Sequence, residues 1–248
     1  MSNIILVHGA WGGAWEFEDT IKQLTSLGHQ ATAIDLPGHG NNSAPINEIT
    51  MDVYVDSVIN AVNASDEKVV LVGHSLAGSI VAQAAERIPE RIDRVVFVAA
   101  FLPADGDSPI ELMKSDEGGK LLPRITFSDD QTFATVDEST VHEVLLHDID
   151  DSNRLEELTP HFFMQQATEP FMRPASLSVS QFGSVPKFYI RASLDKVMSL
   201  GLQDRMITNW DVEGVFTLES SHFPLLSTPG PLADLISETI DSKRKAVA

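Results

Sequence analysis

The chain contains no cysteine among its 248 residues, which excludes disulfide bonds and thiolate metal sites and leaves the redox compartment undetermined. It also lacks any apolar run long enough to cross a bilayer. The apolar stretch at residues 4–7 is too short for the core of a signal peptide, and no basic residue precedes it. We therefore expect a soluble, cytoplasmic protein that does not act in a membrane.

Basic residues are scarce, since the chain has 17 lysines and arginines but 36 aspartates and glutamates. The formal net charge is therefore -19. Nucleic acids and anionic membranes bind basic surfaces, so neither is expected as a partner. A neutral small molecule suits this charge better. The length allows a sizeable core and favours one α/β core with an insertion over two small domains. The sequence leaves the oligomeric state open, with a homodimer as one arrangement.

Continuous apolar segments alternate with segments of helical spacing. Runs of branched aliphatic residues are typical of strands buried on both faces. The alternation predicts a doubly wound, mostly parallel sheet. The predicted strands cover residues 4–7, 31–35, 69–72, 94–101, 186–192 and 214–218, and helices are predicted over residues 51–62, 79–88 and 231–240.

Residues 104–185 break this rhythm with short, acidic segments and aromatic clusters at residues 162–164 and 171–172. We expect an inserted cap over residues 104–185, on a core formed by residues 1–103 and 186–248. Over an active site, the apolar side chains of a cap would form the substrate pocket. Ordinary packing within the cap would explain the same residues equally well.

Ser75 lies where the buried strand at residues 69–72 changes into a helical segment rich in small residues. A sharp turn there would present its hydroxyl at the positive N-terminus of the helix, and Gly73 and Gly78 would provide the clearance that such a turn needs. A serine that merely caps the helix is the alternative. The loop at residues 8–15, after the first strand, has steric freedom at Gly9 and Ala10 to turn backbone N–H groups towards a ligand. It predicts half of an oxyanion hole, with a plain strand-to-helix turn as the alternative.

A serine hydroxyl is a poor nucleophile until a histidine accepts its proton, and the histidine needs a carboxylate to hold its tautomer. Asp195 and His222 follow predicted strands, as Ser75 does. We therefore expect Ser75 as nucleophile, His222 as base and Asp195 as the acid. The rival acids are Asp105 and Asp107, which follow the strand before the cap.

Other polar residues are expected to be structural. Asp35 and His39 lie in or before a proline-glycine turn ahead of Ser75. Residues 148–153 begin like a calcium loop but lack its glycine and its final glutamate, so we expect a solvated acidic loop. His142 and His147 are five residues apart and lack the spacing of a helical zinc motif. We expect neither a metal ion nor a cofactor.

Residues 73–77 resemble the G-x-S-x-G elbow of α/β-hydrolases, with Ala77 in place of the second glycine. The chain is more closely similar to the plant methylesterase and hydroxynitrile lyase family and its bacterial carboxylesterase relatives. This resemblance covers both core segments and is weak through the cap. It implies the α/β-hydrolase fold, the order Ser, Asp, His for the triad, and backbone N–H donors at Ala10 and Leu76 for the oxyanion hole. The segments that carry it are residues 8–11, 73–76 and 99–103, the Asp195 loop, and residues 221–222.

Two positions separate the two chemistries of this family. Some lyases of the family have a threonine directly after the first-strand histidine and a lysine directly after the catalytic histidine. In this chain Gly9 and Phe223 occupy these two positions. Neither residue holds a substrate oxygen or stabilises cyanide, so the resemblance implies hydrolysis of small to medium, neutral, hydrophobic carboxylic esters through an acyl-enzyme. Gly9, Trp11 and Phe223 are expected to line the pocket. A hydroxynitrile lyase and a ligand-sensing protein with little turnover are the alternatives.

Overall fold

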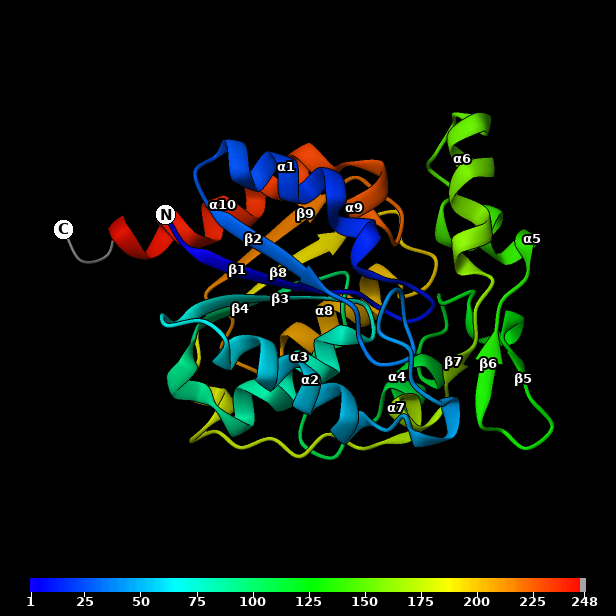
Figure 1. Cartoon of the computed structure of the whole chain (residues 1–248), viewed down its shortest axis with the longest axis horizontal. Helices are drawn as coiled ribbons and strands as arrows, with labels where there is room; N and C mark the ends of the chain where they lie inside the picture. Colours follow the sequence, from blue (N-terminus) through cyan, green and yellow to red (C-terminus); the bar gives the residue numbers. More distant parts are fainter. Residues whose placement is uncertain (246–248) are drawn as a thin grey trace.

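The computed structural model describes residues 1–245, and its centre is a six-stranded sheet in the order β2-β1-β3-β4-β8-β9 (Figure 1). Every neighbouring pair in this sheet is parallel. The predicted doubly wound, parallel sheet is therefore confirmed. Its strands are β1 (Asn3–Val7), β2 (Gln30–Ile34), β3 (Val69–His74), β4 (Ile92–Val98), β8 (Lys187–Ala192) and β9 (Gly214–Leu218).

Helices cover both faces of the sheet, as Figure 1 shows. One face carries α1 (Glu18–Ser26), the short α9 (Pro224–Ser227) and α10 (Pro229–Lys245), while the other carries α2 (Met51–Asn63), α3 (Ala77–Arg87) and α8 (Leu200–Ile207). All six residues of β3 are buried. This agrees with the run of branched aliphatic residues in β3, which suits a strand covered on both sides. None of the helices within residues 1–245 combines the length and the apolar character that a membrane span requires.

The chain order reverses at β1, since β2 lies on one side of this strand and β3 on the other. In open parallel sheets, ligands bind beyond the carboxyl ends of the strands at such a switch point. The loop of residues 8–15 follows β1, and Ser75 directly follows β3. The topology therefore brings the two landmarks of the sequence to the same crevice.

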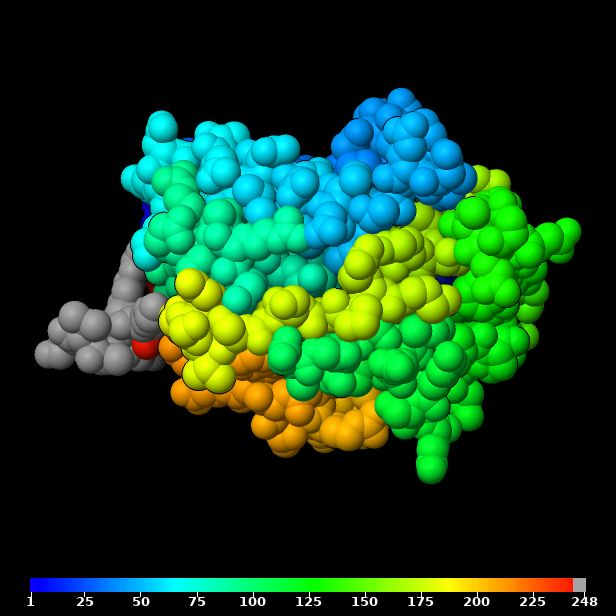
Figure 2. Space-filling view, turned by 90° about the horizontal axis from the view of Figure 1, so that it is seen from below, coloured from blue at the N-terminus to red at the C-terminus, as the bar shows by residue number. Residues whose placement is uncertain are grey.

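The segment between β4 and β8 lies beside the carboxyl ends of the central strands in Figure 1. It contains a small antiparallel sheet in the order β5-β6-β7. After α7 the chain returns across the face seen in Figure 2, where Glu86 of α3 accepts hydrogen bonds from the backbone of Ser178 and Phe182. The elements of the segment are α4 (Pro109–Lys114), β5 (Thr126–Phe127), β6 (Phe133–Thr135), α5 (Glu138–Thr140), a π-helical turn (Val141–Leu145), α6 (Ser152–Leu158), β7 (Gln166–Ala167) and α7 (Glu169–Met172).

Several predicted boundaries were wrong. The strand predicted over residues 94–101 ends at Val98, because Ala99 has a φ of 42° and the chain turns there. Residues 99–102 are buried as a loop rather than as a strand, and burial alone produced the apolar run. The helix after Ser75 begins two residues earlier than predicted, and the C-terminal helix extends over Pro229–Lys245.

Candidate active site

Ser75 lies at the junction of β3 and α3 with a φ of 53°, in the left-handed region that residues other than glycine rarely adopt. Two glycines permit this turn. A Cβ atom on Gly73 would lie 2.8 Å from the Cγ2 atom of Val81, and one on Gly78 would clash with the carbonyl oxygen of Phe101. The strained elbow holds the serine hydroxyl at the start of α3, where it faces the end of the sheet.

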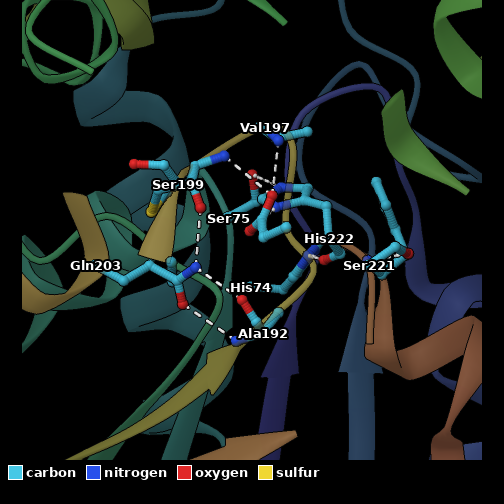
Figure 3. A network of polar contacts seen from close by, with 12 residues as sticks. His74, Ser75, Ala192, Val197, Ser199, Gln203, Ser221 and His222 are labelled. Atoms are coloured by element: carbon cyan, nitrogen blue, oxygen red, sulfur yellow. Dashed lines mark hydrogen bonds and ion pairs between the residues drawn. The ribbon is translucent and has the colours of Figure 1, made fainter. Parts of the chain in front are cut away.

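Ser75, His222 and Asp195 form one hydrogen-bonded chain. Figure 3 shows Ser75 and His222 side by side. The Oγ atom of Ser75 lies 2.8 Å from the Nε2 atom of His222, and the Nδ1 atom of His222 lies 2.7 Å from the Oδ2 atom of Asp195. All three side chains are buried. The residues come from the loops after β3, β9 and β8, so the parallel sheet brings together side chains that are up to 147 residues apart in sequence.

The carboxylate of Asp195 is held by its own loop. Its Oδ1 atom accepts hydrogen bonds from the backbone N–H groups of Val197 at 2.7 Å and Met198 at 2.9 Å. The Oδ2 atom is thereby directed at His222. An ionised carboxylate only accepts hydrogen bonds, so the Nδ1 atom of His222 carries a proton and the Nε2 atom presents its lone pair to the hydroxyl of Ser75.

Gln203 of α8 closes the loop that carries Asp195. Its side chain accepts from the N–H of Ala192 and donates to the carbonyl oxygens of Ala192 and Met198, at the two ends of the loop (Figure 3). Gln203 is buried and lies in the first half of α8. No local pattern distinguished it from other polar helix residues.

The rival acids lie elsewhere. The Oδ1 atom of Asp105 accepts a hydrogen bond from the N–H of Leu177, and the Oδ2 atom of Asp107 accepts one from the N–H of Ala104. The carboxylate of Asp105 therefore joins the start of the segment between β4 and β8 to its end, whereas that of Asp107 fixes a turn at its start. The structure brings Asp195 to the histidine, and neither of the other two.

The loop before His222 is braced from the same segment. The Oδ2 atom of Asp148 accepts a hydrogen bond from the N–H of Ser221 at 2.7 Å, and the Nε2 atom of His147 lies 2.9 Å from the carbonyl oxygen of Leu194. The interpretation of residues 148–153 as a solvated loop was therefore wrong for Asp148, which is only partly exposed. Consecutive residues of one loop hold the backbone beside both Asp195 and His222.

Two backbone N–H groups near Ser75 are available to bind a ligand. Within residues 1–245, no hydrogen-bond acceptor is present for the N–H groups of Ala10 and Leu76. The Nε2 atom of His8 accepts from the N–H of Leu36, so its Nδ1 atom carries the proton and donates to the carbonyl oxygen of Gly9 at 2.8 Å. This bond fixes the peptide that also contains the N–H of Ala10. Burial lowers the pKa of His8 to about 3, so the ring stays neutral.

A small apolar pocket lies at Ser75. Of the three residues predicted for the substrate pocket, Trp11 and Phe223 are among the lining residues and Gly9 is not. A Cβ atom on Gly9 would lie 2.7 Å from the Cβ atom of Ser75, so this glycine packs behind the serine and allows the loop to approach it. The lining residues are Ala10, Trp11, Ser75, Phe101, Met113, Leu121, Leu145, Phe171, Val197, His222 and Phe223.

Apart from Ser75 and His222, the side chains that line the cavity are apolar or aromatic. The indole N–H of Trp11 already donates to the carbonyl oxygen of Ala134. Among residues 1–245, the lining thus includes no lysine or arginine that would neutralise an anionic ligand. Four of the lining residues, Met113, Leu121, Leu145 and Phe171, come from the segment between β4 and β8. Of these four, only Phe171 belongs to an aromatic cluster that the sequence analysis singled out.

A parallel sheet with a buried Ser-His-Asp chain at the carboxyl ends of its strands defines a hydrolase of the serine type. The chain belongs to the alpha/beta hydrolase family, whose model matches residues 4–235. It is 30% identical to Methylesterase 2 of Arabidopsis thaliana over 97% of this chain and 96% of that protein, and 30% identical to Methylesterase 8 of the same plant over 94% and 87%. The resemblance to plant methylesterases is therefore confirmed.

Solved structures agree with this assignment. A pyrethroid hydrolase from Sphingobium faniae JZ-2 is 25% identical, with a TM-score of 0.86 over 98% of this chain and 99% of that one. Polyneuridine aldehyde esterase shares the fold at 23% identity, with a TM-score of 0.81 over 97% and 100%. Relatives also include two longer, chloroplastic methylesterases of Arabidopsis thaliana, of which this chain spans 71% and 63%.

We expect the protein to lose stability in mild acid. Burial lowers the pKa values of His8, His39 and His74, so these rings are neutral in the folded chain but bind protons below about pH 6.5 once unfolded. Burial raises the pKa of the Glu16 carboxyl, which opposes this effect. Three histidines outweigh one carboxyl, so the unfolded chain binds more protons than the folded one below about pH 6.5, and the free energy of unfolding falls on acidification.

Urea unfolding at pH 7.5, 6.5 and 5.5 measures this dependence. In His39→Gln the dependence of the free energy of unfolding on pH should become weaker, because one of the three buried rings is gone. A free energy of unfolding that stays constant or rises on acidification would contradict the account.

Proposed function

We propose that this protein hydrolyses carboxylic esters of small to medium, neutral, hydrophobic substrates through an acyl-enzyme on Ser75. The observation that carries the proposal is the hydrogen-bonded chain Ser75-His222-Asp195 at the mouth of an apolar cavity. The methylesterase, pyrethroid hydrolase and polyneuridine aldehyde esterase relatives support the same reaction class by their names.

In the proposed mechanism, the Oγ atom of Ser75 attacks the ester carbonyl while the Nε2 atom of His222 takes the serine proton. Asp195 stabilises the imidazolium that forms. The backbone N–H groups of Ala10 and Leu76 donate to the oxyanion of the tetrahedral intermediate. His222 returns the proton to the leaving alcohol, and a water molecule, activated by the same histidine, then releases the acid and restores the serine.

We further propose that residues 104–185 act as a cap on a core of residues 1–103 and 186–248. The support is the origin of the cavity wall, since Met113, Leu121, Leu145 and Phe171 lie in the proposed cap and face a serine that lies in the core. The core would then supply the chemistry and the cap the selection of acyl and alcohol groups. We propose the cytoplasm as the compartment, with a small-molecule ester as the partner.

A panel of methyl, aryl and longer-chain esters and lactones tests the proposal, with wild type and Ser75→Ala measured side by side. Multiple turnovers by the wild type, lost in the variant, are expected. A single slow turnover without further product would indicate a sensor instead, and cyanide release from mandelonitrile that depends on Ser75 would indicate a lyase.

Substrate charge is expected to affect the rate. The cavity lining lacks a basic side chain within the described residues, and the chain carries a formal net charge of -19. A neutral ester should therefore have a kcat/KM about tenfold or more above that of its analogue with a carboxylate near the reacting carbonyl, and salt should narrow the gap. Rates for such a pair at low and high ionic strength measure the effect. Equal rates at low salt would contradict it.

A further inference from the structure

Gln166, in β7 of the proposed cap, contacts the backbone of the loop after β1. Its side chain is fully buried. The Oε1 atom accepts a hydrogen bond from the N–H of Trp11 at 3.2 Å, across 155 residues of sequence. The Nε2 atom donates to the carbonyl oxygen of Ala167 and to the hydroxyl of Tyr54, at 3.1 and 3.2 Å. Every hydrogen-bonding contact of this amide is thus made to buried protein groups.

The network continues from Tyr54 to the far side of Trp11. Because the amide of Gln166 donates to the oxygen of Tyr54, the hydroxyl of Tyr54 donates to the Nε2 atom of His39, at 2.9 Å. The Nδ1 atom of His39 then carries a proton and donates to the carbonyl oxygen of Gly12, also at 2.9 Å. Burial lowers the pKa of His39 and raises that of Tyr54, so both groups stay neutral and the direction of the chain is fixed.

Trp11 needs this support because its φ of 55° is rare for a large residue. Such a conformation persists only where the surrounding contacts fix it. Gln166 fixes the peptide between Ala10 and Trp11, and the indole N–H of Trp11 donates to the carbonyl oxygen of Ala134 in β6 at 3.0 Å. The small sheet of the proposed cap therefore holds both the backbone and the ring of the residue next to the proposed oxyanion donor.

We propose that Gln166 is a positioning residue for the oxyanion hole, acting through Trp11 on the N–H of Ala10. This inference rests on the proposed function, since it concerns the transition state of ester hydrolysis. Loss of the acceptor leaves the N–H of Trp11 buried and unpaired, and the peptides on either side rotate to find a partner. The N–H of Ala10 then no longer points at the oxyanion. An interaction made only in the transition state is lost, so kcat falls while KM changes little.

The test compares Gln166→Met with Gln165→Met. Methionine fills a similar volume to glutamine but supplies no amide, and Gln165 is the exposed neighbour with the same side chain. We expect kcat for an aryl ester to fall about 10- to 100-fold in Gln166→Met with KM within about threefold, and both to stay unchanged in Gln165→Met. Gln166→Glu retains an acceptor oxygen for Trp11 and should recover at least part of the lost kcat.

Inhibitor binding separates positioning from general structural damage. An aryl trifluoromethyl ketone forms a tetrahedral adduct with a serine hydroxyl, whereas the matching methyl ketone binds as a ground-state ligand. The inhibition constant of the first should rise in Gln166→Met by the same factor as kcat/KM falls, and that of the second should not change.

Two results would overturn the inference. One is a folded Gln166→Met variant whose kcat stays within twofold of that of Gln165→Met, and the other is an equal loss of affinity for both ketones. If Gln166→Met does not fold, Tyr54→Phe is the second variant, because it removes one hydrogen bond of the network. The kcat of Tyr54→Phe should fall by about threefold or more at constant KM. An unchanged kcat in Tyr54→Phe would also overturn the inference. An active Ser75→Ala variant would instead overturn the proposed function itself.

Discussion

Replacement of Ser75 by alanine should lower kcat/KM for a p-nitrophenyl ester by about three or more orders of magnitude, equivalent to about 4 kcal/mol or more of transition-state stabilisation. The reason is that the Oγ atom of Ser75 is the proposed nucleophile and the only hydroxyl among the residues that line the described cavity. The oxyanion donors and the cavity remain, so a small residual rate should persist. Initial rates over a range of substrate concentrations measure the loss.

Ser79→Ala is the matched control, because Ser79 is a buried serine one turn further along α3. Its hydroxyl has no partner among the described residues, and its loss should leave the rate near that of wild type. His222→Ala should behave like Ser75→Ala, since the serine then has no base. If Ser75→Ala keeps the wild-type rate, the assignment of the nucleophile is wrong.

Asp195→Asn should cost about three to four orders of magnitude in kcat with the fold retained. An asparagine in the same place keeps an oxygen for the N–H groups of Val197 and Met198 and therefore turns its NH2 group towards His222. The ring must then accept at its Nδ1 atom and carry its proton on the Nε2 atom, which faces Ser75. In this tautomer the histidine cannot take the serine proton.

Asp105→Asn provides the control for that variant, because Asp105 follows the neighbouring strand and bonds only the backbone of Leu177 among the described residues. Its rate should stay close to that of wild type. A loss of activity in Asp105→Asn comparable to that in Asp195→Asn, with both proteins folded, would mean that the acid has been misassigned. Circular dichroism and thermal unfolding of both variants establish that the fold is retained.

The sequence predicted those features that depend on local pattern. Runs of branched aliphatic residues located the strands, and polar residues directly after them indicated Ser75, Asp195 and His222, because parallel strands bring their carboxyl ends to one edge. The same reasoning was wrong for the run after Val98, where a buried loop has the composition of a strand. A buried apolar segment carries no signal that separates the two.

Contacts made across the fold were not predictable. Gln166 and Asp148 lie in the acidic segment where the resemblance is weak, and each bonds a backbone group more than 70 residues away. A single polar residue has no periodicity, so its partner is fixed only by the tertiary structure. Gly9 was predicted to line the pocket as the counterpart of a lyase threonine, whereas its lack of a side chain allows close packing against Ser75.

The most direct test of the central claim is to locate the covalent adduct that forms when the protein reacts with diethyl p-nitrophenyl phosphate. The reagent transfers its diethylphosphoryl group to an activated serine and releases p-nitrophenol. The phosphorylated serine is hydrolysed slowly, so the product can be digested and its peptides analysed by mass spectrometry. One diethylphosphoryl group on Ser75, whose incorporation follows the loss of esterase activity, is the predicted result. Full inactivation with the group on another residue, or full activity with Ser75 modified, would contradict the account.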